Sequence, residues 1–176
     1  MKKLLVLAAA ALMVCFSSCD PTVKTLTDYL TAPKKGWVME TAVSDPAYVM
    51  NDGSRIQNLM EGYFFDYEMD DIISFDAEGN ETIDPGKLVA ADGAAYQNVV
   101  TAKYTINEET KILTCQMPWI YEYNDDDLPI GYSPDQEICQ IITLDDNMLK
   151  IRCTIDDVAA PTKDVYSFTI TYVPAK

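Results

Sequence analysis

The residue with the clearest chemical role is a cysteine placed directly after a short apolar segment near the N-terminus. Two lysines open the chain, an apolar run of 13 residues extends from Leu4 to Phe16, and Ser17-Ser18 precede Cys19. This order is typical of a secretory signal that ends in a lipobox. The run is too short for a transmembrane helix, which needs about 20 residues. We therefore expect Cys19 to be the lipid attachment site, carrying palmitate-type acyl chains. Ordinary cleavage without lipidation and a retained membrane helix are the alternatives.

This signal divides the chain and predicts where the protein is found. Residues 1–18 are the predicted lipoprotein signal peptide, 19–34 a lipidated tether with a short helix, and 35–176 one folded domain. The N-terminal lipid anchor makes the membrane a predicted partner, beside a possible small apolar ligand. We expect an outer-membrane lipoprotein of the cell envelope, on either its periplasmic or its cell-surface side.

Three further cysteines remain in the mature chain. Cys115, Cys139 and Cys153 form an odd set in a compartment that permits disulfides. Each stands within an apolar pattern typical of a strand, so we interpret all three as buried small hydrophobic residues. A bridge between Cys139 and Cys153 across a hairpin is the alternative.

The sequence contains no histidine, the commonest general base and metal ligand. This excludes hydrolysis by a Ser-His-Asp or Cys-His pair and the usual zinc sites. Carboxylate-only chemistry remains possible, but no acidic pair stands out. We predict no catalytic residue, no cofactor and no metal site.

Three acidic stretches nevertheless invite a cation hypothesis. Asp76–Thr82 alternates acidic and amide side chains, but it lacks the glycine and the terminal glutamate of a helix-loop-helix calcium site. A polar hairpin turn explains it better. Asp125–Asp127 and the pair Asp70-Asp71 could supply oxygen ligands, but neighbouring side chains on an extended chain point apart. We interpret both as solvated loops.

The charge balance excludes one class of partner. The whole chain has a net charge of −15, and removal of residues 1–18 leaves 11 basic and 28 acidic residues, a net charge of −17. Such a surface repels nucleic acid and anionic lipid headgroups. The remaining 158 residues are enough for one domain with its own core.

The elements that must position these residues are mostly strands. The pattern of residues 24–32 predicts a short helix that ends at Pro33. Apolar residues within Ser54–Gly62 also recur at a weak helical spacing. Elsewhere apolar residues recur with a period of two. The predicted strands are Gly36–Val43, Asp71–Phe75, Glu81–Asp84, Val99–Ile106, Lys111–Met117, Gln136–Leu144, Leu149–Ile155 and Val165–Val173.

Eight strands joined mostly by hairpins predict an all-β fold, an eight-stranded antiparallel up-and-down barrel. The last strand has the cleanest alternation, with one face predicted to be buried. That face consists of Tyr166, Phe168, Ile170 and Tyr172. A β-sandwich of the same strands is the alternative.

The links between these strands alternate between short and long. In a meander, alternate links lie at opposite ends, so tight turns close one end and long loops surround the other. The long loops are rich in aromatic residues, which suits a ligand site at the barrel mouth. The candidate ligand-binding residues are Tyr63, Phe64, Tyr67, Trp119 and Tyr121. Alternatively, these rings only cover the mouth as a satellite core.

Four segments carry a resemblance to a known family. They are the Ser17-Ser18-Cys19 lipobox, the Lys35-Gly36-Trp37 opening, Asp70–Asn80 and Ile141–Ile151. Together they resemble the lipocalin-like lipoproteins of Gram-negative gut anaerobes, over Lys35 to Val173. The resemblance implies an eight-stranded calyx, no enzymatic role for most members and no shared catalytic residues.

Two functions follow as hypotheses. The first is a non-enzymatic lipid-anchored barrel that binds a small apolar or amphipathic ligand at its mouth. The second is an accessory protein whose aromatic loops dock on an envelope complex, with side chains filling the barrel. The inward residues that would fill it are Trp37, Met39, Tyr104, Leu113, Ile151, Phe168 and Ile170.

Replacement of Cys19 tests the anchor. We expect Cys19→Ala to release the protein from the membrane, because the variant loses the site of its acyl chains. Detergent-phase partitioning measures the effect. Unchanged partitioning of the variant would contradict the lipobox interpretation.

Overall fold

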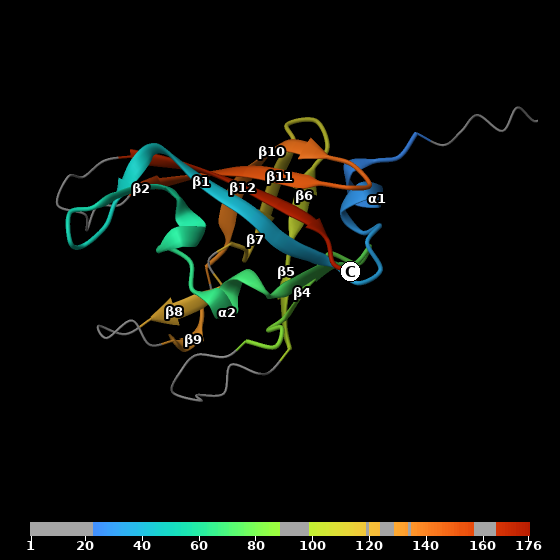
Figure 1. Ribbon diagram of the computed structural model, residues 1–176. Helices are drawn as coiled ribbons and strands as arrows, with labels where there is room; N and C mark the ends of the chain where they lie inside the picture. The colour runs from blue at the N-terminus through green and yellow to red at the C-terminus, as the bar shows by residue number, and fades with distance from the viewer. Residues whose placement is uncertain (1–22, 89–98, 119, 124–128, 134, 157–164) are drawn as a thin grey trace, which may run out of the picture.

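The computed structural model describes residues 23–88, 99–118, 120–123, 129–133, 135–156 and 165–176 (Figure 1). The helical elements are α1 (Leu26–Leu30), the 3-10 helix η1 (Leu59–Glu61) and α2 (Asp66–Met69). None of the helices in these ranges is long and apolar enough to cross a membrane. The strands are β1 (Trp37–Val49), β2 (Arg55–Asn58), β3 (Ile72–Phe75), β4 (Asn80–Asp84), β5 (Val100–Lys103), β6 (Thr105–Asn107), β7 (Ile112–Cys115), β8 (Tyr121–Tyr123), β9 (Pro129–Tyr132), β10 (Glu137–Leu144), β11 (Leu149–Asp156) and β12 (Val165–Pro174).

The main sheet is an antiparallel meander that curls back on itself. Its order is β5-β4-β3-β1-β12-β11-β10-β7-β6, so the first strand of the chain pairs with the last. Their register runs from Trp37 opposite Pro174 to Asp45 opposite Ser167. The two outermost strands, β5 and β6, follow each other in the chain and nearly close the ring. This confirms the up-and-down barrel and excludes the sandwich.

The fourth predicted strand is divided into two, which corrects its prediction as one continuous element. β5 pairs with β4, and β6 pairs with β7. Tyr104 lies between them, where its hydroxyl donates to the Asp76 carbonyl at 2.6 Å and its N–H donates to the Gly79 carbonyl at 3.1 Å. These bonds to the β3–β4 turn hold the bend at which the chain changes pairing partner.

The first strand is longer than the predicted Gly36–Val43. β1 continues to Val49 through a cis Asp45-Pro46 bond. Pro46 stands where the pairing with β2 is irregular, a position at which a strand tolerates the missing N–H. The weak helical pattern over 54–62 is also corrected, because β2 and η1 occupy this segment.

A separate hairpin, β8–β9, lies in the connection between β7 and β10, which the sequence pattern predicts to be a loop. Tyr121 is opposite Tyr132, and the Ser133 N–H donates to the Ile120 carbonyl at 2.9 Å. This hairpin forms its own two-stranded sheet. It can therefore present side chains beside the barrel without joining the barrel ladder.

Helix α1 covers the end of the barrel that the short turns close (Figure 1). A capping box between Thr25 and Asp28 starts it. The Glu108 carboxylate, in the β6–β7 turn, accepts the N–H groups of Leu26 and Thr27 at 2.8 and 3.1 Å. Lys24 forms an ion pair with Asp146, in the β10–β11 turn. The predicted helix over 24–32 is thus confirmed in its central part.

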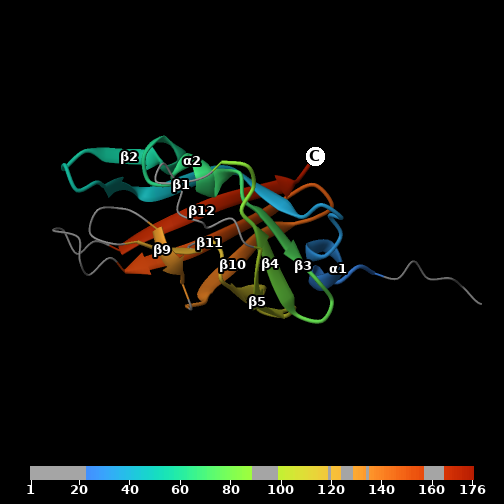
Figure 2. The same ribbon diagram turned by 90° about the horizontal axis from the view of Figure 1, so that it is seen from below.

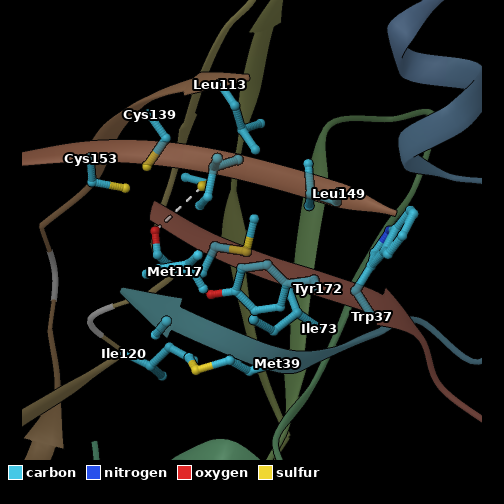
Figure 3. Packing of buried hydrophobic residues seen from close by; sticks show 14 of the residues in the cluster. Trp37, Met39, Ile73, Leu113, Met117, Ile120, Cys139, Leu149, Cys153 and Tyr172 are labelled. Atoms are coloured by element: carbon cyan, nitrogen blue, oxygen red, sulfur yellow. Dashed lines mark hydrogen bonds between the residues drawn. The ribbon is translucent and has the colours of Figure 1, made fainter. Parts of the chain in front are cut away.

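The core occupies the barrel interior (Figure 3). Trp37 is fully buried and its indole N–H donates to the Leu30 carbonyl at 2.8 Å. The three cysteines of the folded domain, Cys115, Cys139 and Cys153, are buried and their thiols are free. This agrees with their interpretation as small hydrophobic residues. Cys139 and Cys153 are opposite each other on β10 and β11, and no bridge joins them in the structure.

The last strand provides a stability test. Phe168 is fully buried and packs against Tyr48 and Tyr63, whereas Thr169 is half-buried on the other face. We expect Phe168→Ala to lower the free energy of unfolding by about 3–5 kcal/mol and Thr169→Ala by less than about 1 kcal/mol. Chemical denaturation measures both. Equal losses would contradict the orientation of β12.

Candidate functional site at the open end of the barrel

The described parts of the long connections, which include β2, α2 and the β8–β9 hairpin, lie toward the end of the barrel opposite α1 (Figure 2). β1 starts with Trp37 at the closed end, where its first residues pair with β3. Farther along, from Val43 to Val49, β1 pairs with β2. The antiparallel partner β12 starts at this open end, with Ser167 opposite Asp45. The elements η1 and α2 follow β2 in the same connection. The predicted division into a turn end and a loop end is therefore confirmed.

One group of rings covers the barrel mouth beside the paired strands β1 and β12. The Tyr63 ring meets Tyr48, Phe64 and Phe168 edge to face, at centroid distances of 4.9, 5.1 and 5.1 Å. Tyr48 also lies 4.9 Å from Tyr166. Phe64 is buried and Tyr63 is half-buried. These contacts continue the core into the mouth, as the satellite-core interpretation predicts for this group.

A second group of rings leads from the surface to a buried carboxyl; we call Phe65, Tyr67, Tyr121 and Asp71 the aromatic–carboxyl site. Phe65 is 39% exposed and stacks on Tyr67 at 5.3 Å with nearly parallel planes. Tyr67 meets Tyr121 edge to face at 6.0 Å. The Tyr121 hydroxyl then donates to Oδ2 of Asp71 at 3.0 Å. Asp71 itself is only 2% exposed.

The surroundings of Asp71 favour its neutral form. Burial raises the pKa of this carboxyl to about 8, against the opposing effect of the Tyr121 hydrogen bond. The negative charges of Asp70, Glu68 and Asp84 raise it further. Oδ1 of Asp71 is buried and has no hydrogen-bond partner among the described residues. The site thus ends in a protonated carboxyl with one unused oxygen.

Asp70 fixes the backbone beside this carboxyl. Its Oδ2 accepts the N–H groups of Lys87 and Leu88 at 2.7 and 3.1 Å. Gly86 has φ +47° and lies so close that a Cβ there would come within 2.5 Å of Asp70. The interpretation of Asp70-Asp71 as a solvated loop is therefore wrong, because one residue is buried and the other clamps the segment after β4.

The other acidic stretches do not form a site in the described residues. Asp76 accepts the N–H groups of Glu78 and Asn80 at 2.9 and 2.8 Å, which confirms the polar hairpin turn. Asp125–Asp127 lie outside the described residues. Within the described ranges no group of three or more acidic or cysteine side chains is arranged to hold a metal ion.

A second buried carboxylate lies inside the barrel. Glu81 is fully buried on β4, and its two oxygens accept the N–H groups of Gln116 and Met117 at 2.7 and 3.2 Å. Burial raises its pKa to about 7, although the two N–H donors favour the charged form. It ties β4 to the segment that follows β7. This tie lies near the place where the ring of strands is incomplete.

The predicted site residues fall into the two groups of rings. Tyr63 and Phe64 belong to the group that covers the mouth, whereas Tyr67 and Tyr121 belong to the aromatic–carboxyl site. Trp119 and Cys19 lie outside the described residues. Sequence reasoning missed the roles of Asp71 and Glu81. For Glu81 a signal existed, since it stands two residues before Ile83 and therefore faces inward with it.

Comparisons with known proteins add little to this geometry. No family model matches the chain, and no curated protein matches it. Among solved structures, a complex of bovine odorant binding protein with undecanal aligns over 84% of this chain and 74% of that chain, at 14% identity and a TM-score of 0.35. A complex of the same bovine protein with a selenium-containing odorant aligns over 87% and 74%, at the same identity and TM-score. At this level of similarity, the architecture rests on the strand pairing described above.

The two buried carboxyls predict how stability depends on pH. Folding raises both pKa values, so the folded protein retains protons that the unfolded chain releases above about pH 4.5. The free energy of unfolding should therefore fall, by on the order of a few kcal/mol, as the pH rises from 5 to 8. Denaturation at several pH values measures this slope.

Asp71→Asn should reduce this slope, because the amide retains the size of the side chain and its contact with Tyr121 but cannot ionise. Asp145→Asn is the matched control, since Asp145 is exposed in the β10–β11 turn. An unchanged slope in Asp71→Asn would show that Asp71 does not titrate in this range.

Proposed function

We propose that this protein is a non-enzymatic, lipid-anchored lipoprotein of the cell envelope that binds a small apolar or amphipathic ligand at the open end of its barrel. The observation that carries the proposal is the aromatic–carboxyl site. Phe65 offers an exposed ring, Tyr67 a half-buried one, and Tyr121 a buried one beside a carboxyl. Apolar walls with a few convergent polar groups are the usual composition of a small-molecule site.

The anchor in this proposal rests on the Ser17-Ser18-Cys19 motif. The position of α1 indicates where such an anchor would attach, because the described chain reaches the barrel at the closed end, beside Asp146 and Glu108. A tether attached to a membrane before Val23 would leave the aromatic end directed away from that membrane. The proposal covers both the periplasmic and the cell-surface side of the outer membrane.

A second candidate function is an accessory protein that docks on an envelope complex through its aromatic loops. One observation favours it: every residue of the predicted inward set is buried. That set is Trp37, Met39, Tyr104, Leu113, Ile151, Phe168 and Ile170. Side chains packed in the interior would leave the loops, rather than a calyx, as the functional surface.

Binding of the neutral fluorescent probe N-phenyl-1-naphthylamine tests the first candidate. The Cys19→Ala background removes the acyl chains, which would compete for the probe. We expect saturable binding, weakened by about 1 kcal/mol or more in Tyr67→Ala, as is usual for an aromatic anchor. Trp119→Ala should act in the same direction.

Tyr29→Ala is the control, because Tyr29 lies in α1 at the closed end. Equal effects of Tyr29→Ala and Tyr67→Ala would contradict a site at the open end. Absence of saturable binding would leave the accessory-protein candidate.

A further inference from the structure

Oδ1 of Asp71 indicates which polar group a ligand at this site would carry. Asp71 is 2% exposed, and its Oδ1 has no hydrogen-bond partner among the described residues. A buried polar atom without a partner destabilises the folded state, because it has lost its hydrogen bonds to water. A ligand group that donates a hydrogen bond to Oδ1 would offset that loss.

The charges around Asp71 determine whether the polar group of the ligand should be cationic or anionic. The charged side chains that act on it in the described part of the chain are Glu68 of α2, Asp70 and Asp84, and all three are acidic. Among the described residues, the side chain that donates a hydrogen bond to Asp71 is that of Tyr121 in β8, which is neutral. An anionic headgroup would be repelled here, whereas a cationic donor would be attracted.

The rings give this position an apolar wall. Tyr121 contacts both Asp71 and Tyr67, and Tyr67 stacks on the exposed Phe65. Aromatic faces attract cations as well as hydrocarbon. An alkyl chain lying along Phe65 and Tyr67 would thus place its polar end near the carboxyl.

We propose that the open end selects amphipathic primary amines, with the ligand ammonium bound by Asp71 and its alkyl part held by Phe65, Tyr67 and Tyr121. This inference rests on the proposed ligand-binding function and names its ligand class. Binding moves one proton: the Asp71 carboxyl releases it to solvent, and the resulting carboxylate pairs with the ammonium.

Competition between octylamine and octan-1-ol tests this selectivity. Both displace N-phenyl-1-naphthylamine if they bind, they have the same alkyl chain, and they differ in the charge of the polar end. Octylamine remains charged below about pH 10, as a lysine side chain does. At pH 8.5 we expect octylamine to bind at least about tenfold more tightly than octan-1-ol.

The pH dependence identifies the responsible group. Since burial holds Asp71 protonated at low pH, the preference for octylamine should shrink at pH 6.0, while octan-1-ol binding stays constant. In Asp71→Asn the ratio of the two Kd values should be close to one at both pH values. Asp145→Asn, in the distant β10–β11 turn, should retain the preference of the wild type.

Tyr121→Phe provides an independent variant that keeps the ring. The Tyr121 hydrogen bond lowers the pKa of Asp71, so its loss should shift the midpoint of the octylamine pH profile upward. A mere packing role of Tyr121 would change affinity for both ligands without moving this midpoint.

The outcomes separate the two proposals. Equal binding of octylamine and octan-1-ol at pH 8.5, or a retained preference in Asp71→Asn, would overturn the amine inference and leave a site for neutral ligands. Failure of both ligands to displace a bound probe would overturn the amine inference alone, whereas failure of the probe to bind would overturn the proposed ligand-binding function and the amine inference with it.

Discussion

Pairing between the first and the last strand is the contact on which the rest of the structure depends. The β1–β12 ladder joins the half of the sheet that continues through β3, β4 and β5 to the half that continues through β11, β10, β7 and β6. Its inward residues include Trp37, Ala42, Phe168 and Tyr172, all buried. Because the two strands are far apart in the chain, ordering their connection is costly in entropy and has to be offset by this burial. Without the ladder, the two halves would expose unpaired edges and the interior they share.

The strand positions could be predicted because one face of most strands is buried, which imposes a period of two on the sequence. The predicted alternation reappears as exposed or half-buried and buried residues from Val165 to Ile170, whereas Thr171 is buried together with its neighbours. The departures have tertiary causes that a local pattern does not contain. Tyr104 bends its strand by bonding to the β3–β4 turn, and Pro46 is accommodated where the pairing between β1 and β2 is irregular.

The aromatic residues of the candidate site could be predicted from the sequence, whereas its buried carboxyl could not. The strand alternation places the long links at one end, and this end brings together Tyr63 with Phe64, and Tyr67 with Tyr121. Asp71 was missed because an acidic pair before a strand usually lies in solvent. Burying two carboxyls opposes folding. Asp71 and Glu81 are nevertheless fixed in place, Asp71 by a phenol and Glu81 by two backbone N–H groups.

Both ends of the described chain leave the molecule at the closed end. The Ala175 N–H donates to the Gly36 carbonyl at 2.9 Å, and α1 lies beside the same strand start through the Trp37 bond to Leu30. A fluorescent protein fused after Lys176 would therefore stand at the end remote from the rings. The protein could likewise be immobilised on a sensor surface through its C-terminus, with the open end left unobstructed.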